Sequence, residues 1–263
     1  MFPVDFLAFQ DENDAIPLYQ KFLALPKPST KLAFADVGLE VDGPFAVLSS
    51  KATFVRALDH GVPVVLKCYG RPEDTNCEIE AAIALGTSDV LRANHLVPIR
   101  MLSATVPAVR PLPSRVVRVI VMPLYAGCIS MLLPQVPRPD TVVRIGRQVL
   151  TSLCFLHSKM FVHCDVKPAN ILMDHVCPAF FCCVFPCVFF LVCFIAFDRQ
   201  DGCVYLGDYG AMVKIGERIR ESTPEYMPSD FTEATPAADL FCLAATLLDL
   251  VCIFGMRLQW LNH

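Results

Sequence analysis

The chain has 263 residues, of which 54% are hydrophobic and 18% are charged. A chain this long and this apolar can bury a large core, which excludes an intrinsically disordered protein. The formal net charge of −4 provides no overall positive field, so the composition argues against a nucleic-acid-binding protein.

The N-terminal residues lack the basic stretch of a secretory signal and turn acidic at Asp11, Glu12 and Asp14. The thirteen cysteines are odd in number and include no C-x-x-C pair, which argues against a disulfide scaffold. We therefore expect a cytoplasmic protein with reduced thiols.

The first half of the chain has mainly strand patterns. Residues 1–43 mix acidic and proline-containing stretches and predict an N-terminal extension. Residues 62–69 form an apolar, β-branched run that predicts a strand, and the helix formers in 73–85 predict a helix. Two further strands are predicted at 95–102 and 115–122, on either side of a proline-rich loop.

The second half has mainly helical patterns. A helix is predicted to begin near Asp140, because apolar residues then recur at spacings of three and four. This stripe consists of Val142, Ile145, Val149, Leu153 and Leu156. Strands followed by helices predict an α+β fold with two lobes rather than a layered α/β sheet.

The most informative motif is VHCDVKPANILMD, residues 162–174. It resembles the catalytic loop of eukaryotic protein kinases, H-R-D-x-K-P-x-N, with Cys164 where arginine is usual. The resemblance implies a bilobal protein-kinase-like fold with a small β-rich N-lobe and a helical C-lobe.

The resemblance also implies roles for three residues of this loop. Asp165 would orient the substrate hydroxyl and accept its proton, and Lys167 would neutralise charge at the γ-phosphate. Asn170 would supply an amide oxygen to Mg²⁺. A lysine at position 167 is typical of the serine/threonine branch, so the implied reaction is phosphoryl transfer from ATP to Ser or Thr hydroxyls.

Lys67, at the end of the apolar run VVLK, resembles the strand lysine that holds the ATP phosphates. Its expected partner is a carboxylate on the following helix. Glu78 fits best and Glu80 is the alternative.

The segment LGDYG, residues 206–210, resembles the D-F-G element. Asp208 would then be the second Mg²⁺ ligand, and Tyr209 would pack inward near His163. The segment follows a credible strand and comes after the catalytic loop, as the resemblance requires.

Residues 119–133 resemble the strand, hinge and first C-lobe helix of a kinase. Met122 would be the gatekeeper, and the backbone from Pro123 through Leu124 to Tyr125 would face adenine.

Residues 222–230, STPEYMPSD, resemble the end of an activation segment. Residues 238–250 resemble the buried central helix, in which Asp239 would steady the backbone of the catalytic loop. A plain core helix with an N-terminal cap is equally compatible with the second pattern.

These matches predict an extension at 1–43, an N-lobe at 44–124 and an incomplete C-lobe at 125–263. Three departures from the family pattern matter. Ser49 and Lys51 stand where phosphate-binding glycines are usual, which lowers the expected affinity for ATP. Cys164 removes an arginine that senses an activation-segment phosphate, which concerns regulation and leaves Asp165 unchanged. The C-lobe is expected to be shortened, and this departure and the missing glycines leave catalysis open. An inactive pseudokinase or interaction module is therefore the alternative.

Residues 176–197 contain no charged residue and include seven phenylalanines. Three interpretations stay open: a membrane span, an insertion into a hairpin, or a translated intron within a kinase gene. A single span would separate Asn170 from Asp208, which must share one Mg²⁺ site.

The expected partner is a protein substrate and not a nucleic acid, with membrane association only if 176–197 inserts. The oligomeric state stays open.

Overall fold

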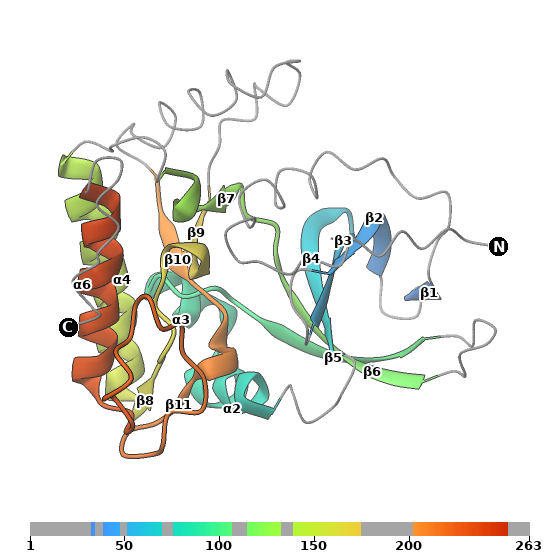
Figure 1. The fold of residues 1–263 in the computed structure, drawn as a ribbon. Helices are drawn as coiled ribbons and strands as arrows, with labels where there is room; N and C mark the ends of the chain where they lie inside the picture. The colour runs from blue at the N-terminus through green and yellow to red at the C-terminus, as the bar shows by residue number, and fades with distance from the viewer. Residues whose placement is uncertain are drawn as a thin grey trace. The chain divides into compact units, whose positions relative to one another are not determined.

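The computed structural model describes residues 33–34, 39–47, 52–69, 76–106, 115–132, 139–174 and 202–251. The chain divides into two compact units (Figure 1). The first comprises Met1–Ala82 and Pro98–Leu124, and the second comprises Ile83–Val97 and Tyr125–His263. Each unit is described by itself.

The first unit is built on a six-stranded antiparallel sheet in the order β1-β2-β3-β4-β6-β5 (Figure 1). Its strands are β1 Ala33–Phe34, β2 Leu39–Val47, β3 Ala52–Asp59, β4 Val62–Tyr69, β5 Arg100–Val106 and β6 Arg115–Pro123. Alternate residues of the central strands face one core, as the two-residue period of a strand requires. This core contains Leu39, Val55, Ala57, Val64, Leu66, Val119 and Val121.

The β3–β4 hairpin turns at His60 and Gly61, whose φ angles are both positive, 49° for His60 and 83° for Gly61. Two positive φ angles in a two-residue loop match the right-handed twist of the flanking strands. The turn fixes Asp59 opposite Val62 and thereby places Lys67 opposite Phe54.

Two strand boundaries differ from the sequence prediction. The sheet begins within residues 1–43, where an extension was expected, because β1 and the start of β2 belong to it. The register of β2 shifts between Val41 and Phe45, and this irregularity hides the alternating pattern. The strand predicted at 95–102 begins only at Arg100, since Pro98 has no N–H to donate to a ladder.

Helix α2, Asn76–Leu85, occupies most of the range predicted as a helix and is followed by Gly86 with a φ of 103°. Gly86 suits this position because glycine adopts positive φ at a helix end without steric cost. The short helix α3, Ser88–Ala93, belongs to the second unit.

The second unit contains two long helices, α4 Pro139–Ser158 and α6 Pro236–Val251. The apolar stripe predicted for α4 is confirmed, because all five of its residues are buried. Leu247 of α6 lies 3.1 Å from the position that a Cβ atom on Gly146 would take, and His157 Nε2 lies 2.8 Å from Asp239 Oδ2. These contacts join opposite ends of the two helices, so α4 and α6 pack antiparallel.

The second unit also contains two small antiparallel sheets of short strands. A three-stranded sheet contains β10 Val204–Leu206, β9 Ile171–Met173 and β7 Gly127–Cys128 in that order. A two-stranded sheet pairs β11 Val213–Lys214 with β8 Phe161–Val162. The β9–β10 hairpin is closed by the Asp174 N–H, which donates to the Cys203 carbonyl at 3.1 Å.

Residues 176–197 fall between the two strands of this hairpin and lie outside the described residues. Among the residues that the structure describes, no helix is both long enough and apolar enough to cross a membrane. The three interpretations of the apolar block stay predictions.

Deletion of residues 175–197 tests whether the hairpin depends on this block. The deletion removes none of the paired residues of the hairpin, in which Ile171 lies opposite Leu206 and Met173 opposite Val204. Residues 198–202 would then connect Asp174 to Cys203. We expect the deletion to raise the free energy of unfolding by about 1–2 kcal/mol, since a shorter loop costs less entropy to close. Urea unfolding followed by circular dichroism measures it.

Leu206→Pro is the contrasting variant, because it removes the N–H that donates to the His95 carbonyl at 2.8 Å. It should unfold the second unit. A deletion variant as unstable as Leu206→Pro would show that the block is part of the fold.

Candidate active site

In the first unit, Lys67 of β4 forms a buried ion pair with Glu78 of α2. Lys67 Nζ lies 2.7 Å from Glu78 Oε1, and the two side chains are only 8% and 3% exposed. Glu80 is exposed, so Glu78 is the partner of the two carboxylates considered. Lys67 Nζ also lies 5.9 Å from the centre of the Phe54 ring. The lysine is thus held as a fixed positive charge on the sheet.

Met122 of β6 lies on the same sheet, where it packs with Phe54 and Ile99 against the buried Ile120. Beyond it, the Leu124 N–H donates to the Pro63 carbonyl at 3.3 Å. This bond continues the β4–β6 pairing past Pro123 and fixes the backbone where the hinge was predicted.

Tyr125, the last predicted hinge residue, belongs to the second unit and is buried. Its ring centre lies 5.4 Å from that of Tyr205. Burial raises the pKa of the Tyr125 hydroxyl well above its ordinary range, so the side chain is neutral. The next residue, Ala126, donates its N–H to the Met173 carbonyl at 2.9 Å, which fixes the backbone here too.

The loop of residues 162–170 is attached to α6 through the fully buried carboxylate of Asp239. Its two oxygens accept the backbone N–H groups of His163 and Cys164, each at 2.9 Å. His157 Nε2 approaches the same carboxylate at 2.8 Å. A second bond runs from Thr246 Oγ1 of α6 to the Val166 carbonyl at 3.3 Å. Asp239 therefore steadies the loop backbone, as the sequence predicts.

Asp165, Lys167 and Thr223 form a compact polar cluster. Thr223 Oγ1 donates to Asp165 Oδ1 at 2.6 Å and accepts from Lys167 Nζ at 2.7 Å. Lys167 Nζ also lies 3.1 Å from Asp165 Oδ2. Chemically, one carboxylate oxygen can accept the proton of an aliphatic hydroxyl, while the ammonium group lies beside that hydroxyl and beside the other carboxylate oxygen.

Thr223 is the member of this cluster that sequence reasoning missed. It lies within the motif STPEYMPSD, but its contact with Asp165 spans 58 positions of the chain. No local pattern signals such a contact. The available signal was a hydroxyl residue in a segment that resembles the end of an activation segment.

Asn170 and Asp208 lie at the same end of the β9–β10 hairpin. Asn170 directly precedes β9, and the N–H of Gly207, directly before Asp208, donates to the Asn170 carbonyl at 2.9 Å. Gly207 cannot be replaced without movement, because a Cβ atom there would lie 2.8 Å from the side chain of Val97. Asp208 itself adopts a left-handed conformation with a φ of 60°.

The aromatic and imidazole side chains beneath this end of the hairpin fix its position. His163 Nε2 lies 3.0 Å from the Gly207 carbonyl, and its Nδ1 accepts the Asp165 N–H at 3.3 Å. Tyr209 is buried, and its hydroxyl donates to the Val97 carbonyl at 2.7 Å. The rings of His163 and Tyr209 meet edge to face at 6.2 Å, as the sequence predicts.

The donor set at this end of the hairpin fits Mg²⁺, which prefers oxygen ligands. Asn170 Nδ2 donates to both the carbonyl and the Oδ2 of Asp165, each at 2.9 Å. These two bonds use both amide hydrogens, so Oδ1 is the atom that could bind a cation. Among the described residues, no group of three or more His, Cys, Asp or Glu side chains could hold a metal ion.

Cys164 occupies the place of the usual arginine. It is fully buried with a φ of 64°, and burial raises the pKa of its thiol well above the ordinary range. A neutral thiol offers no positive charge to a phosphate. Ser49 and Lys51, the other predicted departures, lie outside the described residues.

The structure thus brings Asp165, Lys167 and Asn170 together, with Asp208 at the adjoining hairpin end. Tyr125 belongs to the same second unit. The other predicted site residues, Lys67, Glu78, Met122 and Leu124, belong to the first unit.

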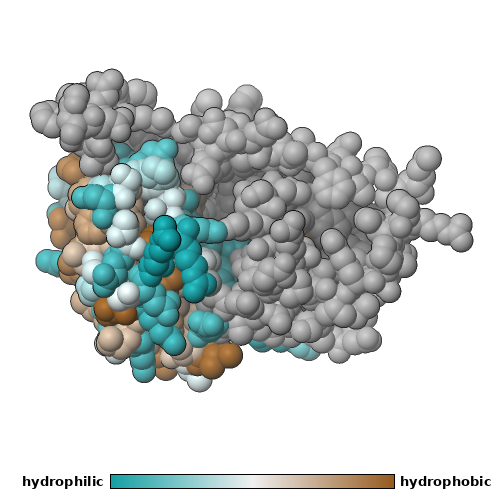
Figure 2. All heavy atoms as spheres, turned by 60° about the horizontal axis from the view of Figure 1, so that its bottom comes forward, coloured by the Kyte–Doolittle hydropathy of each residue, from teal (hydrophilic) through white to brown (hydrophobic). Residues whose placement is uncertain are grey.

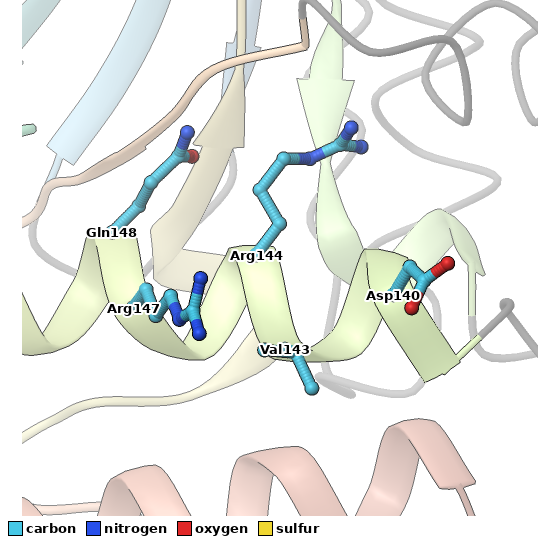
Figure 3. Close-up of a pocket in the computed structure, with 5 residues that line it drawn as sticks. All are labelled: Asp140, Val143, Arg144, Arg147 and Gln148. Carbon is cyan, nitrogen blue, oxygen red and sulfur yellow. The ribbon is translucent and has the colours of Figure 1, made fainter.

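The second unit also has two hollows that no predicted site residue lines. One, of about 330 Å³, is lined by residues 218–222, Pro228, Ser229, Phe231 and Thr232, on the face that Figure 2 brings forward. The other, of about 460 Å³, lies along α4 (Figure 3). Its lining residues are Asp140, Val143, Arg144, Arg147 and Gln148.

Comparison with protein families matches a model described as protein kinase domain to residues 119–255. The serine/threonine-protein kinase ArnS of Sulfolobus acidocaldarius is 30% identical over 124 residues, which are 44% of this chain and 18% of ArnS. The serine/threonine-protein kinase mos of Mus musculus is 27% identical over 116 residues, or 40% of this chain and 26% of mos. The chain therefore spans only a small part of these curated relatives.

Among solved structures, vaccinia related kinase 3 matches with a TM-score of 0.62 at 15% identity. The match covers 95% of this chain and 76% of that chain. At this identity the likeness concerns the fold alone, and the predicted α+β fold with a β-sheet N-lobe is confirmed.

The buried pair can be tested by Glu78→Gln, with Glu80→Gln as the matched control. Loss of the Glu78 charge leaves the Lys67 ammonium buried without its carboxylate, which should lower the free energy of unfolding by about 3 kcal/mol. The exposed Glu80 should change it by less than about 0.5 kcal/mol. Urea unfolding measures both changes. Equal losses in the two variants would show that the ion pair does not stabilise the fold.

The attachment of the 162–170 loop to α6 can be tested by Asp239→Asn, with Asp230→Asn at an exposed position as its control. An amide keeps the size of the carboxylate but turns an NH₂ group toward a backbone N–H. We expect the variant to lose about 2–4 kcal/mol of unfolding free energy. A variant as stable as the control would contradict the anchoring role of Asp239.

Proposed function

The chain belongs to the protein kinase family, and from this premise we propose that it transfers the γ-phosphoryl group of ATP to Ser or Thr hydroxyls of protein substrates. The family match covers residues 119–255, which is more than half of the chain. The observation that carries the proposal is the hydrogen-bonded cluster of Asp165, Lys167 and Thr223.

In this proposal Asp165 is the general base. The Thr223 hydroxyl donates to Asp165 Oδ1 at 2.6 Å, which supports the use of this oxygen to orient a substrate hydroxyl and to accept its proton. Asn170 holds the other oxygen through a bond of 2.9 Å. The carboxylate is therefore fixed in one orientation before substrate arrives, which favours catalysis.

Lys167 is proposed to stabilise charge on the transferred phosphoryl group. Its ammonium already lies between the acceptor-like hydroxyl of Thr223 and the carboxylate of Asp165. Asn170 and Asp208 would hold Mg²⁺, which when bound neutralises charge on the ATP phosphates. Lys67, fixed by Glu78, would hold the phosphates of ATP, and Met122, Leu124 and Tyr125 would contact its adenine.

The competing proposal is an inactive pseudokinase that acts as an interaction module. Ser49 and Lys51 favour it, because they replace glycines that let a backbone approach phosphates closely. The buried, neutral Cys164 favours it less, since the proposed base Asp165 is unaffected. Either function leaves the protein substrate or partner unnamed.

Asp165→Asn separates these proposals when phosphoryl transfer from radiolabelled ATP to a mixture of Ser and Thr peptides is measured. An amide cannot accept the proton, so the rate should fall by about 10²–10⁴-fold. The exposed Asp89 of α3 provides the control Asp89→Asn, which should keep the full rate. Transfer that survives in Asp165→Asn would refute the catalytic assignment, and no transfer by the unaltered chain would favour the pseudokinase.

A further inference from the structure

A polar hollow of about 330 Å³ lies in the segment that joins β11 to α6. Its lining includes two guanidinium groups, from Arg218 and Arg220, and three hydroxyls, from Ser222, Ser229 and Thr232. Figure 2 shows hydrophilic residues interspersed with hydrophobic ones on this face of the second unit. The hollow therefore differs in chemistry from an apolar pocket, which takes uncharged side chains.

The walls of this hollow are held by backbone hydrogen bonds. The Ile219 N–H donates to the Thr232 carbonyl at 3.0 Å, and the Ala234 N–H donates to the Glu217 carbonyl at 2.8 Å. Arg218 and Glu233 are also paired as an isolated antiparallel bridge. These bonds hold the two halves of the segment together and fix the backbone of the lining.

The hollow adjoins the proposed acceptor site. Ser222 lines it, and the next residue, Thr223, places its hydroxyl 2.6 Å from the Asp165 carboxylate. Thr223 is itself fixed, since its carbonyl accepts the N–H groups of Tyr226 and Met227, each at 3.0 Å. A peptide whose hydroxyl reaches Asp165 would therefore pass its neighbouring side chains beside the hollow.

The charge of the lining favours an anion. The lining contains two arginines and one carboxylate, that of Glu221, so its formal charge is positive. Within the described residues, no ion pair involves the guanidinium of Arg218. Guanidinium groups match carboxylate and phosphate oxygens in geometry as well as in charge, and hydroxyls can donate to the remaining oxygens.

We propose that this hollow is a substrate subsite for an anionic side chain, a carboxylate or a phosphate monoester, close to the acceptor Ser or Thr. The subsite rests on the proposed function, because the acceptor position is defined by Asp165. Arg218 and Arg220 are its specificity-determining residues. They take no part in the phosphoryl transfer itself.

The test uses the full chain and a set of peptides with one acceptor serine and otherwise uncharged residues. In each peptide one flanking position is changed to glutamate, phosphoserine, glutamine or arginine. KM and kcat are measured separately for each peptide. The best-placed glutamate or phosphoserine should lower KM roughly tenfold relative to glutamine at the same position, with kcat unchanged. The glutamate and phosphoserine series decide which anion the hollow prefers.

Arg218→Gln and Arg220→Gln should each reduce this preference and leave the KM of the glutamine peptide unchanged. Lys214→Gln removes an exposed positive charge from β11, outside the lining, and should keep the preference. Equal KM values for all peptides, or a preference that survives in both arginine variants, would overturn the subsite while leaving the proposed function intact.

Peptide binding decides the matter if the chain transfers no phosphate. Fluorescein-labelled phosphoserine and glutamine peptides are then compared by fluorescence anisotropy with the unaltered chain and Arg218→Gln. Tighter binding of the phosphoserine peptide that depends on Arg218 would support the subsite while the proposed function fails. Equal binding of both peptides would overturn the subsite.

Discussion

The buried carboxylate of Asp239 is the constraint on which the second unit depends. It accepts two backbone N–H groups of the 162–170 loop and lies against His157 of α4, so one side chain connects α4, α6 and the loop. A buried carboxylate is stable only when such partners satisfy it. Because Cys164 has a φ of 64°, the loop adopts a conformation that L-residues rarely take, and these bonds hold it there.

The β9–β10 hairpin supplies the second constraint. Its ladder sets Leu206 opposite Ile171, so the residues that follow Leu206 and precede Ile171 meet at one end. His163 links this end to the loop through the Gly207 carbonyl at 3.0 Å. The loop that presents Asp165 and the turn that presents Asp208 are thus positioned by one connected set of hydrogen bonds.

Much of this arrangement could be predicted from the sequence, because the chemistry lies in short contiguous motifs. The motif at 162–174 and the spacing of apolar residues on α4 are local properties, and both predict elements that the structure contains. The contact between Thr223 and Asp165 is not local, and no periodicity reports it. The start of β2 was missed because a register shift breaks its alternation, and the start of β5 because Pro98 precedes it.

The segment between β11 and α6 is held in place without the arginine that Cys164 replaces. The buried thiol of Cys164 is neutral and cannot attract a phosphate. Backbone bonds hold the segment instead, including the Gly216 N–H, which donates to the Ala234 carbonyl at 2.9 Å. The Tyr226 hydroxyl donates to Asp249 Oδ2 of α6 at 2.6 Å and fixes its far end. Since none of these bonds needs a phosphate, the Thr223 hydroxyl reaches Asp165 in the unmodified chain.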